Sequence, residues 1–297
     1  MASTAPVNVS SDPALRAPWT AYRTWACTAV FHKQAIDRLT LWSLRLGIAG
    51  AIIATLAQLI HTGPSWLAKS VGGLGAAIVA LAAYLSKQAQ ANDRSVTWTK
   101  SRSAAESLKS GIILYRVSAP PFDGADRASQ LRTRVENLLD SLKSVESRQP
   151  DDKPVPSGTM SLDEYINGRV QDQVAWYRKR AGEYQKKADL FRQITAVLMG
   201  VAAILAVASA LKEVSVWAPV VATIIGAITA HLKNQQYQML ITMYTSTALR
   251  LDLLAGEWAA SGKTDQDKAE RDTFIKSCED TMSAENGAWV GLWSKKQ

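Results

Sequence analysis

The sequence has few of the residues that build metal centres and disulfides. Two cysteines and three histidines occur among its 297 residues, and neither residue type has zinc-ligand spacing. The glycine-rich stretch 71–77 lacks the Lys and the Ser or Thr of a phosphate-binding loop. No nucleophile or acid-base pair stands out either. We therefore expect a protein that is not an enzyme and that holds no metal or other cofactor.

Charge is missing from four long stretches of the chain. At about 1.5 Å per residue the shortest of them spans roughly 26 Å as a helix, close to the ~30 Å hydrocarbon core of a bilayer. Core helices of a soluble protein, the alternative, usually keep a polar stripe on one face. The stretches hold only isolated polar residues and predict four transmembrane helices. They are residues 46–68, 70–86, 194–211 and 214–232.

Lys and Arg concentrate beside these stretches. They outnumber Asp and Glu in the flanking segments 16–45, 87–116, 178–193 and 233–250, whereas the two short connections hold only Lys69 and the pair 212–213. Because cytoplasmic loops are enriched in Lys and Arg, both termini and the central segment are predicted to be cytoplasmic. In this topology the basic residues that give the net charge of +8 lie beside the membrane, where anionic lipids attract them. Nucleic-acid binding, the competing interpretation, lacks an interleaved aromatic and basic surface, so no nucleic-acid partner is expected.

The chain repeats a two-helix plan. Lys87 pairs with Lys233 and Trp98 with Tyr244, both at an offset of 146 residues. The fold class is thus an all-α membrane protein with two tandem helical hairpins and long cytoplasmic helical extensions. Its expected parts are a disordered N-terminal segment (1–18), a first two-transmembrane unit (19–146), a linker rich in proline and aspartate (147–160) and a second two-transmembrane unit (161–297).

Two cytoplasmic patterns predict helices. Ser161 and Glu164 have capping-box spacing, so a long helix is expected to begin there and run into the membrane. An apolar stripe before the linker predicts an amphipathic helix that either packs on the protein's own helices or self-associates. The stripe consists of Leu131, Val135, Leu138, Leu142 and Val145.

Three segments then show a family resemblance. "YINGRVQDQVAWYRKRAGEYQKKADLFR" (165–192) and "FIKSCEDTMSAENGAWVGLW" (274–293) resemble the SLATT family, and "WTKSRSAAESLKSGIILYR" (98–116) resembles a divergent member of it. These are two-transmembrane effector domains associated with nucleotide-generating (SMODS) and nucleotide-sensing (SLOG) components of bacterial conflict systems. The resemblance covers most of 19–293 as two fused copies. One departure is Ala248, which stands where the first copy has Arg102.

The resemblance implies a membrane effector of a bacterial nucleotide-linked defence system, in the inner membrane, that forms a pore or disrupts the membrane. A cytoplasmic nucleotide-sensing partner is implied as well. The alternative is a non-conducting scaffold that anchors or regulates a cytoplasmic partner. Four short helices can hardly enclose a water-filled path alone, so a pore would need a homo-oligomer.

Residues in the apolar stretches are candidates for specific roles. Small residues at every fourth position let membrane helices approach closely, and three such stripes are predicted to pack: Gly72, Ala76 and Ala80; Ala202, Ala206 and Ala210; and Ala222, Gly226 and Ala230. Polar positions are candidates for the lining of a pore, although they could equally bond their own or a neighbouring helix: Thr55, Gln58, Thr223 and Thr229.

Charged and aromatic residues outside the stretches suggest two further roles. Arg45 and Arg192 are predicted to anchor the helices at the inner membrane interface. Two helical faces could dock a partner, or instead tie the cytoplasmic helices together. The first is Trp98, Arg102 and Glu106, and the second is Trp176 and Arg180.

Overall fold

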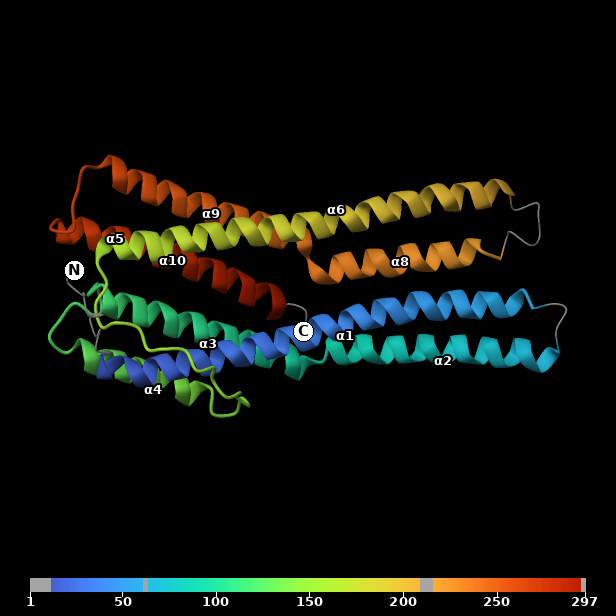
Figure 1. Cartoon of the computed structure of the whole chain (residues 1–297), viewed down its shortest axis with the longest axis horizontal. Helices are drawn as coiled ribbons and strands as arrows, with labels where there is room; N and C mark the ends of the chain where they lie inside the picture. The colour runs from blue at the N-terminus through green and yellow to red at the C-terminus, as the bar shows by residue number, and fades with distance from the viewer. Residues whose placement is uncertain (1–11, 61–63, 209–215, 295–297) are drawn as a thin grey trace, which may run out of the picture. The chain divides into compact units, whose positions relative to one another are not determined.

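The computed structural model describes residues 12–60, 64–208 and 216–294, and the regular elements in these ranges are helices (Figure 1). They are α1 (Pro13–Gln58), α2 (Ser65–Ala89), α3 (Asn92–Arg116), α4 (Arg127–Ser141), α5 (Leu162–Tyr165), the π-helix η1 (Ile166–Gln171), α6 (Asp172–Val207), α8 (Ala218–Gln235), α9 (Tyr237–Ala260) and α10 (Lys268–Ser294). The all-α prediction is confirmed for these residues. The chain divides into two compact units. Unit 1 comprises 1–33, 95–178 and 243–297, and unit 2 comprises 34–94 and 179–242.

Each repeat begins with one long helix. α1 contains 46 residues, and α5, η1 and α6 together form a second 46-residue helix. The predicted capping box starts this second helix: the Ser161 hydroxyl accepts from the Glu164 N–H at 3.2 Å, and the Glu164 carboxylate accepts from the Ser161 N–H at 2.8 Å. Two backbone donors that a helix start leaves unpaired are thereby satisfied.

Replacing Ser161 with alanine should remove one half of this box and lower the free energy of unfolding by about 1 kcal/mol. Thermal unfolding of the detergent-solubilised protein, followed by circular dichroism, measures the loss. Ser129→Ala, at an exposed position of α4, is the control and should leave the midpoint unchanged. Equal midpoints for the two variants would show that the cap contributes nothing.

The second helix of each repeat is interrupted at the same place. α2 ends before Gln90 and α8 ends before Gln236, and these two C-cap residues are 146 positions apart. The helices that follow bury matching positions, because Trp98 of α3 and Tyr244 of α9 are each 2% exposed. The repeat offset read from the sequence therefore holds in the structure.

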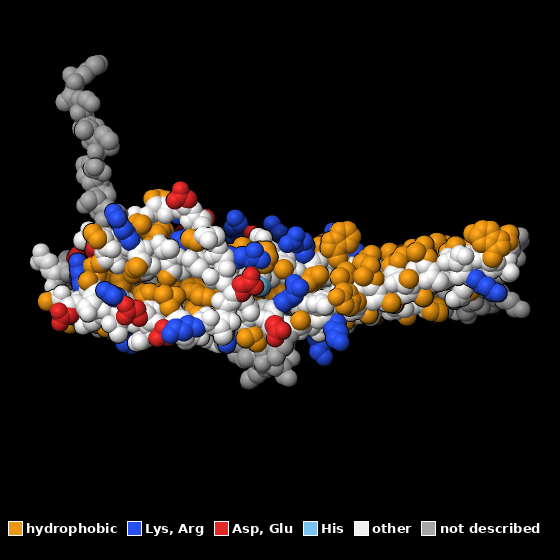
Figure 2. All heavy atoms as spheres, turned by 90° about the horizontal axis from the view of Figure 1, so that it is seen from below, with side chains coloured by type: hydrophobic (Ala, Val, Ile, Leu, Met, Phe, Trp, Pro, Cys, Tyr) orange, Lys and Arg blue, Asp and Glu red, His pale blue; other side chains and the backbone are white. Residues whose placement is uncertain are grey.

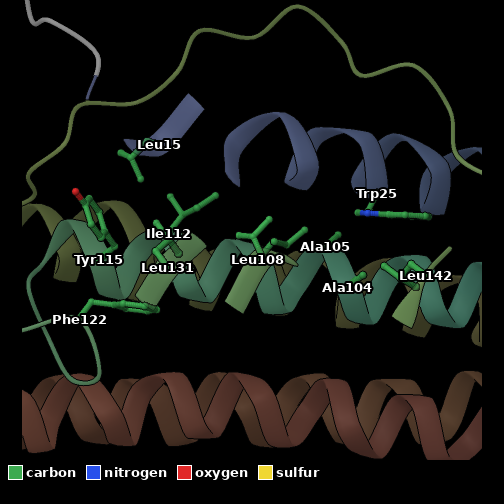
Figure 3. Packing of buried hydrophobic residues seen from close by; sticks show 11 residues of the cluster. Leu15, Trp25, Ala104, Ala105, Leu108, Ile112, Tyr115, Phe122, Leu131 and Leu142 are labelled. Atoms are coloured by element: carbon green, nitrogen blue, oxygen red, sulfur yellow. The ribbon is translucent and has the colours of Figure 1, made fainter. Parts of the chain in front are cut away.

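An apolar cluster of unit 1 lies where α1, α3 and α4 meet (Figure 3). Leu15 and Trp25 of α1 face Leu108 and Ile112 of α3, and Leu131 of α4 completes the contact. The predicted amphipathic stripe supplies the α4 side: Leu131, Val135 and Leu142 are buried, and Leu138 and Val145 pack against them. The stripe thus packs on the protein's own helices.

The N-terminal boundary needs a correction. Residues 1–11 lie outside the described ranges, but 13–18 form the first turns of α1 rather than a disordered segment. Pro13 suits a helix start because its φ is already near the helical value. The Asp12 carboxylate accepts from the Ala14 N–H at 2.9 Å, and Leu15 is fully buried. A local cap and one core side chain therefore order this turn.

The linker 147–160 contains no helix, as its prolines predict. Hydrogen bonds and an ion pair hold it against the helices of unit 1. The Trp19 indole donates to the carbonyl of Lys153 at 3.1 Å, and the Arg116 Nε donates to the carbonyl of Ser157 at 2.7 Å. Arg23 also pairs with Asp151. The linker is therefore part of the packing of unit 1.

Candidate functional site

Three long helical segments carry apolar windows that the protein leaves uncovered. They are Pro13–Gln58, Ser65–Arg116 and Leu162–Val207, and only 11, 11 and 0% of the apolar window in each is buried. Val197, Ile204 and Val207 are 67, 69 and 87% exposed. Burying such side chains is worth about 1.5–3 kcal/mol each. The uncovered windows therefore require an apolar environment, and they identify a membrane protein.

Figure 2 shows where apolar and charged side chains lie on the molecular surface. Hydrophobic side chains cover the face made by the α1–α2 pair, whereas Lys, Arg, Asp and Glu side chains crowd the face of unit 1. The fourth apolar stretch, 214–232, starts in residues outside the described ranges, and its residues 218–232 belong to α8.

α1 and α2 run antiparallel with their backbones in close contact in unit 2. A Cβ at Gly75 would lie 2.6 Å from the Ala54 nitrogen, and one at Gly50 would lie 3.0 Å from the Val79 nitrogen. Gly72 also lies opposite α1, but a Cβ there would make an ordinary contact of 3.5 Å with the Cβ of Ala57. These contacts recur with the alternating three- and four-residue spacing of left-handed helix pairs. Glycine is needed at 50 and 75 because any side chain there would collide with the opposing backbone.

The first predicted packing stripe is therefore only partly correct. Gly72 belongs to the contact, but Ala76 and Ala80 are exposed, and Gly75 and Ala82 take their places. The reason is periodicity: four-residue steps drift around a 3.6-residue helix, whereas alternating steps of three and four stay on the buried face.

In the two other predicted stripes, one described residue is half-buried and the other described residues are exposed. Ala202 of α6 is half-buried, whereas Ala206 is exposed and Ala210 lies outside the described residues. On α8 the stripe of Ala222, Gly226 and Ala230 is exposed, and a Cβ at Gly226 would meet nothing within 4 Å. Contact between α6 and α8 instead includes Phe191 and His231, whose rings are 5.1 Å apart.

The candidate pore-lining residues differ in their bonding. The Thr55 hydroxyl donates to the carbonyl of Ala51 at 3.1 Å, and the Thr223 hydroxyl donates to the carbonyl of Pro219 at 2.8 Å. Both thus bond their own helix backbone, the alternative considered above. Gln58, the last residue of α1, and Thr229 on α8 are exposed.

The candidate interface anchors are both exposed. The Arg45 guanidinium lies 5.6 Å from the centre of the Trp42 ring, a pair that suits the boundary between lipid and water. Arg192 forms an ion pair with Asp189 at 2.7 Å, one helical turn earlier. Their role as anchors stays a prediction.

The most deeply buried ion pair of unit 1 joins η1 to α10. Arg169 and Glu279 are 4 and 6% exposed, and two parallel hydrogen bonds of 3.0 Å connect the guanidinium to the carboxylate. The fully buried Tyr165 hydroxyl donates to the same carboxylate at 3.3 Å. Burial alone would raise the pKa of Glu279, but the charge and hydrogen bonds of Arg169 outweigh it and hold that pKa below its usual value.

The π-helical turn places Arg169 in this position. A π-turn adds a residue to the helical turn and turns side chains away from the α-helical pattern. Arg169 and Val170, both buried, are in this turn. The Lys109 ammonium on α3 lies within electrostatic range: its burial, and then the charge of Arg169, lowers the pKa of Lys109. A cluster of charges is thus enclosed where α3, η1 and α10 meet.

A second buried group connects the two repeats. Arg102 on α3, in the first repeat, lies 3.4 Å from the carboxylate of Glu285 on α10, in the second. The Tyr177 hydroxyl on α6 donates to the other oxygen of that carboxylate at 3.2 Å. Burial raises the pKa of Glu285, with Arg102 opposing the shift. One carboxylate of the second repeat is thereby shared between helices of both.

These contacts bear on the residues considered for partner docking. Trp98 is 2% exposed and lies under the Lys33 ammonium, 4.7 Å from its ring centre, and Arg102 is occupied by Glu285. The half-buried Glu106 lies within electrostatic range of Arg169. This face therefore holds helices together in the structure. A partner could dock at this face only if the helices that it joins moved apart.

The second face of the docking prediction is more accessible. Trp176 is 36% exposed and its ring centre lies 5.6 Å from that of Tyr244. Arg180 is exposed and pairs with Glu183 at 2.8 Å. Docking at Trp176 and Arg180 stays a prediction.

Sequence reasoning missed the roles of Arg169 and Glu279. Both lie inside the segments that carry the family resemblance, and that was the only signal pointing to them. Among the described residues, no group of three or more metal-ligating side chains comes together. Cys27 and Cys278 are free thiols, and burial raises the pKa of Cys278 to about 12, which disfavours its reactive thiolate.

Comparison with known protein families matches the sequence to two domain models. Residues 28–165 match SMODS and SLOG-associating 2TM effector domain 3, and residues 165–289 match SMODS and SLOG-associating 2TM effector domain 1. No curated protein and no solved structure matches the chain. The two matches follow one another and together span most of the sequence. The chain therefore belongs to the SLATT family and carries two of its two-transmembrane effector domains in tandem.

Proposed function

We propose that this protein is a gated membrane effector of a bacterial nucleotide-linked defence system, and that an assembly of several chains forms a pore or disrupts the inner membrane. The observation that carries the proposal is the set of uncovered apolar windows on helices that continue into a charged, well-packed unit. The effector description of both domain models supports the same reading.

The proposed topology has four transmembrane helices in two hairpins, with both termini in the cytoplasm. The close α1–α2 contact supports the first hairpin. The apolar window of α6, followed by α8, supports the second. The basic flanks of all four stretches support cytoplasmic termini, because Lys and Arg accumulate on that side. Unit 1 would then face the cytoplasm, where a nucleotide-sensing partner could reach it.

Gating would act through the long helix of the second repeat. Its N-terminal turns hold the buried pair Arg169–Glu279, and the same helix continues to Val207 through an uncovered apolar window. A ligand or partner that disturbs this pair would therefore act on a continuous helix. A non-conducting scaffold is the alternative, and the exposed Trp176 supports it as a place for a partner to bind.

Ion flux across liposomes tests conduction. We expect liposomes with the wild-type protein to leak, and empty liposomes to stay tight, once candidate cyclic nucleotides are supplied. Gln58→Leu should change the flux several-fold, because Gln58 is the exposed polar residue at the end of the α1 window. Thr223→Val is the comparison, since Thr223 bonds its own helix and its loss should change flux little.

Two results would contradict parts of this proposal. Wild-type liposomes that stay tight with every nucleotide tested would favour the scaffold. Flux that is equal in wild type and Gln58→Leu would remove Gln58 from the lining while leaving conduction in place.

A further inference from the structure

One face of α9 is open in the second repeat, although the equivalent face of α3 is covered in the first. Leu249 and Leu253 are 54 and 58% exposed, and Gly256 and Ala260, which continue the face, are exposed as well. Their spacing of four, three and four residues keeps them on one side of the helix. Asp252 and the exposed Glu257 border this face, and the strip between them is uncharged and partly apolar.

The repeat shows what the equivalent strip contacts in the first copy. The offset of 146 pairs Leu249 with Ser103, Leu253 with Ser107 and Gly256 with Ser110, and all three serines are half-buried. Ser110 hydrogen-bonds Glu279 of α10, and Arg102 beside this face reaches Glu285 of the same helix. A helix of the following repeat therefore lies against α3.

Among the described residues, no helix of a further repeat covers this strip of α9. We infer that the strip of Leu249, Leu253, Gly256 and Ala260 binds the first repeat of a second copy of this chain. That contact would continue, between chains, the arrangement by which the second repeat already lies against α3 within one chain. A leucine pair suits an interface between chains because it brings apolar area where α3 has serines.

Such a contact joins two different surfaces, one from each end of the tandem. Head-to-tail contacts of this kind close into rings when the rotation per chain divides a full turn. The inference rests on the proposed assembly of several chains, and it names the surface through which those chains would bind one another. It does not depend on conduction, because a scaffold would assemble through the same face.

The test is the mass of the full-length protein in detergent, measured by light scattering with the detergent contribution subtracted. Leu249→Lys with Leu253→Lys should raise the monomer fraction at least tenfold over wild type. Leu249→Ser with Leu253→Ser, which installs the residues of Ser103 and Ser107, should raise it less and guards against a folding defect. Leu190→Lys, at a 54% exposed position of α6 in the second repeat but outside the strip, is the matched control and should assemble like wild type.

Circular dichroism of each variant should show wild-type helix content. A monomeric wild type would overturn the inference, and so would an assembly that survives both double substitutions. Equal dissociation by Leu190→Lys would also overturn it, because the effect would then not belong to α9. Since mass is measured rather than flux, an assembled but non-conducting protein would refute the pore and leave this interface intact.

Discussion

Replacing Gly75 with leucine should separate α1 from α2 and abolish any membrane activity of the protein. A Cβ at this position would lie 2.6 Å from the backbone nitrogen of Ala54, and backbone cannot move aside as the end of a flexible side chain can. Overpacking of a filled contact costs about 1–3 kcal/mol and more where no rotamer fits. We expect a lower thermal midpoint in detergent and a loss of flux.

The neighbouring Gly73 provides the control for this substitution. It is on the same helix, is exposed, and has nothing within 4 Å of the place where a Cβ would be. Gly73→Leu adds the same volume to the same apolar window and should leave stability near that of wild type. If both variants were equally stable, the close contact between α1 and α2 would not exist in the membrane.

Removing the charge of Glu279 should cause the largest loss of stability in unit 1. Glu279→Gln would leave the Arg169 guanidinium, 4% exposed, without its carboxylate. Breaking one partner of a buried pair costs about 3–5 kcal/mol because the remaining charge is uncompensated. Glu136→Gln provides the contrast: its pair with Arg132 is 57% and 80% exposed, and such surface pairs contribute about 0–1 kcal/mol.

A double substitution separates the pair from the packing around it. Arg169→Met with Glu279→Leu should recover much of the stability lost in Glu279→Gln, because apolar side chains of similar volume need no counter-charge. If the double variant were less stable than Glu279→Gln, the cost would arise from cavities rather than from charge. Thermal unfolding in detergent measures all three variants.

The pH dependence of unfolding follows from the lowered pKa of Glu279. A carboxylate whose pKa falls on folding stabilises the protein above its unfolded pKa of about 4.3, and this contribution is lost as pH falls through the folded value. Wild type should therefore lose more stability than Glu279→Gln between neutral pH and acid below pH 4. The difference between the two proteins should shrink as the pH falls.

The sequence predicted those features that depend on local chemistry. The capping box of Ser161 and Glu164 formed as expected because it needs only residues three positions apart. The stripe that includes Leu131 and Val135 packed as expected because helical periodicity alone decides which face is apolar. The helix breaks at Gln90 and Gln236 are separated by the same offset of 146 because related sequences break alike, but the sequence did not predict the breaks themselves.

Features that depend on a partner element were harder to predict. Alanine and glycine are so frequent in the apolar stretches that several stripes fit, and only the position of α1 selects Gly75 over Ala76. The pair of Arg169 and Glu279 joins residues that are 110 positions apart. Arg169 lies in a π-turn, which no residue pattern in the sequence predicts. Burial of Trp98 likewise depends on unit 1 as a whole, so a residue considered for docking proved to be packed inside.

The shared carboxylate of Glu285 bears on how the two repeats have diverged. Arg102 of the first repeat supplies its charge partner, and the second repeat has Ala248 at the matching position. A second repeat expressed alone would keep the acid and lose the arginine, leaving a buried negative charge with a tyrosine hydroxyl as its described partner. The two repeats have therefore become complementary: the first supplies the arginine and the second the acid of one buried pair, so a single repeat would hold only one of the two charges.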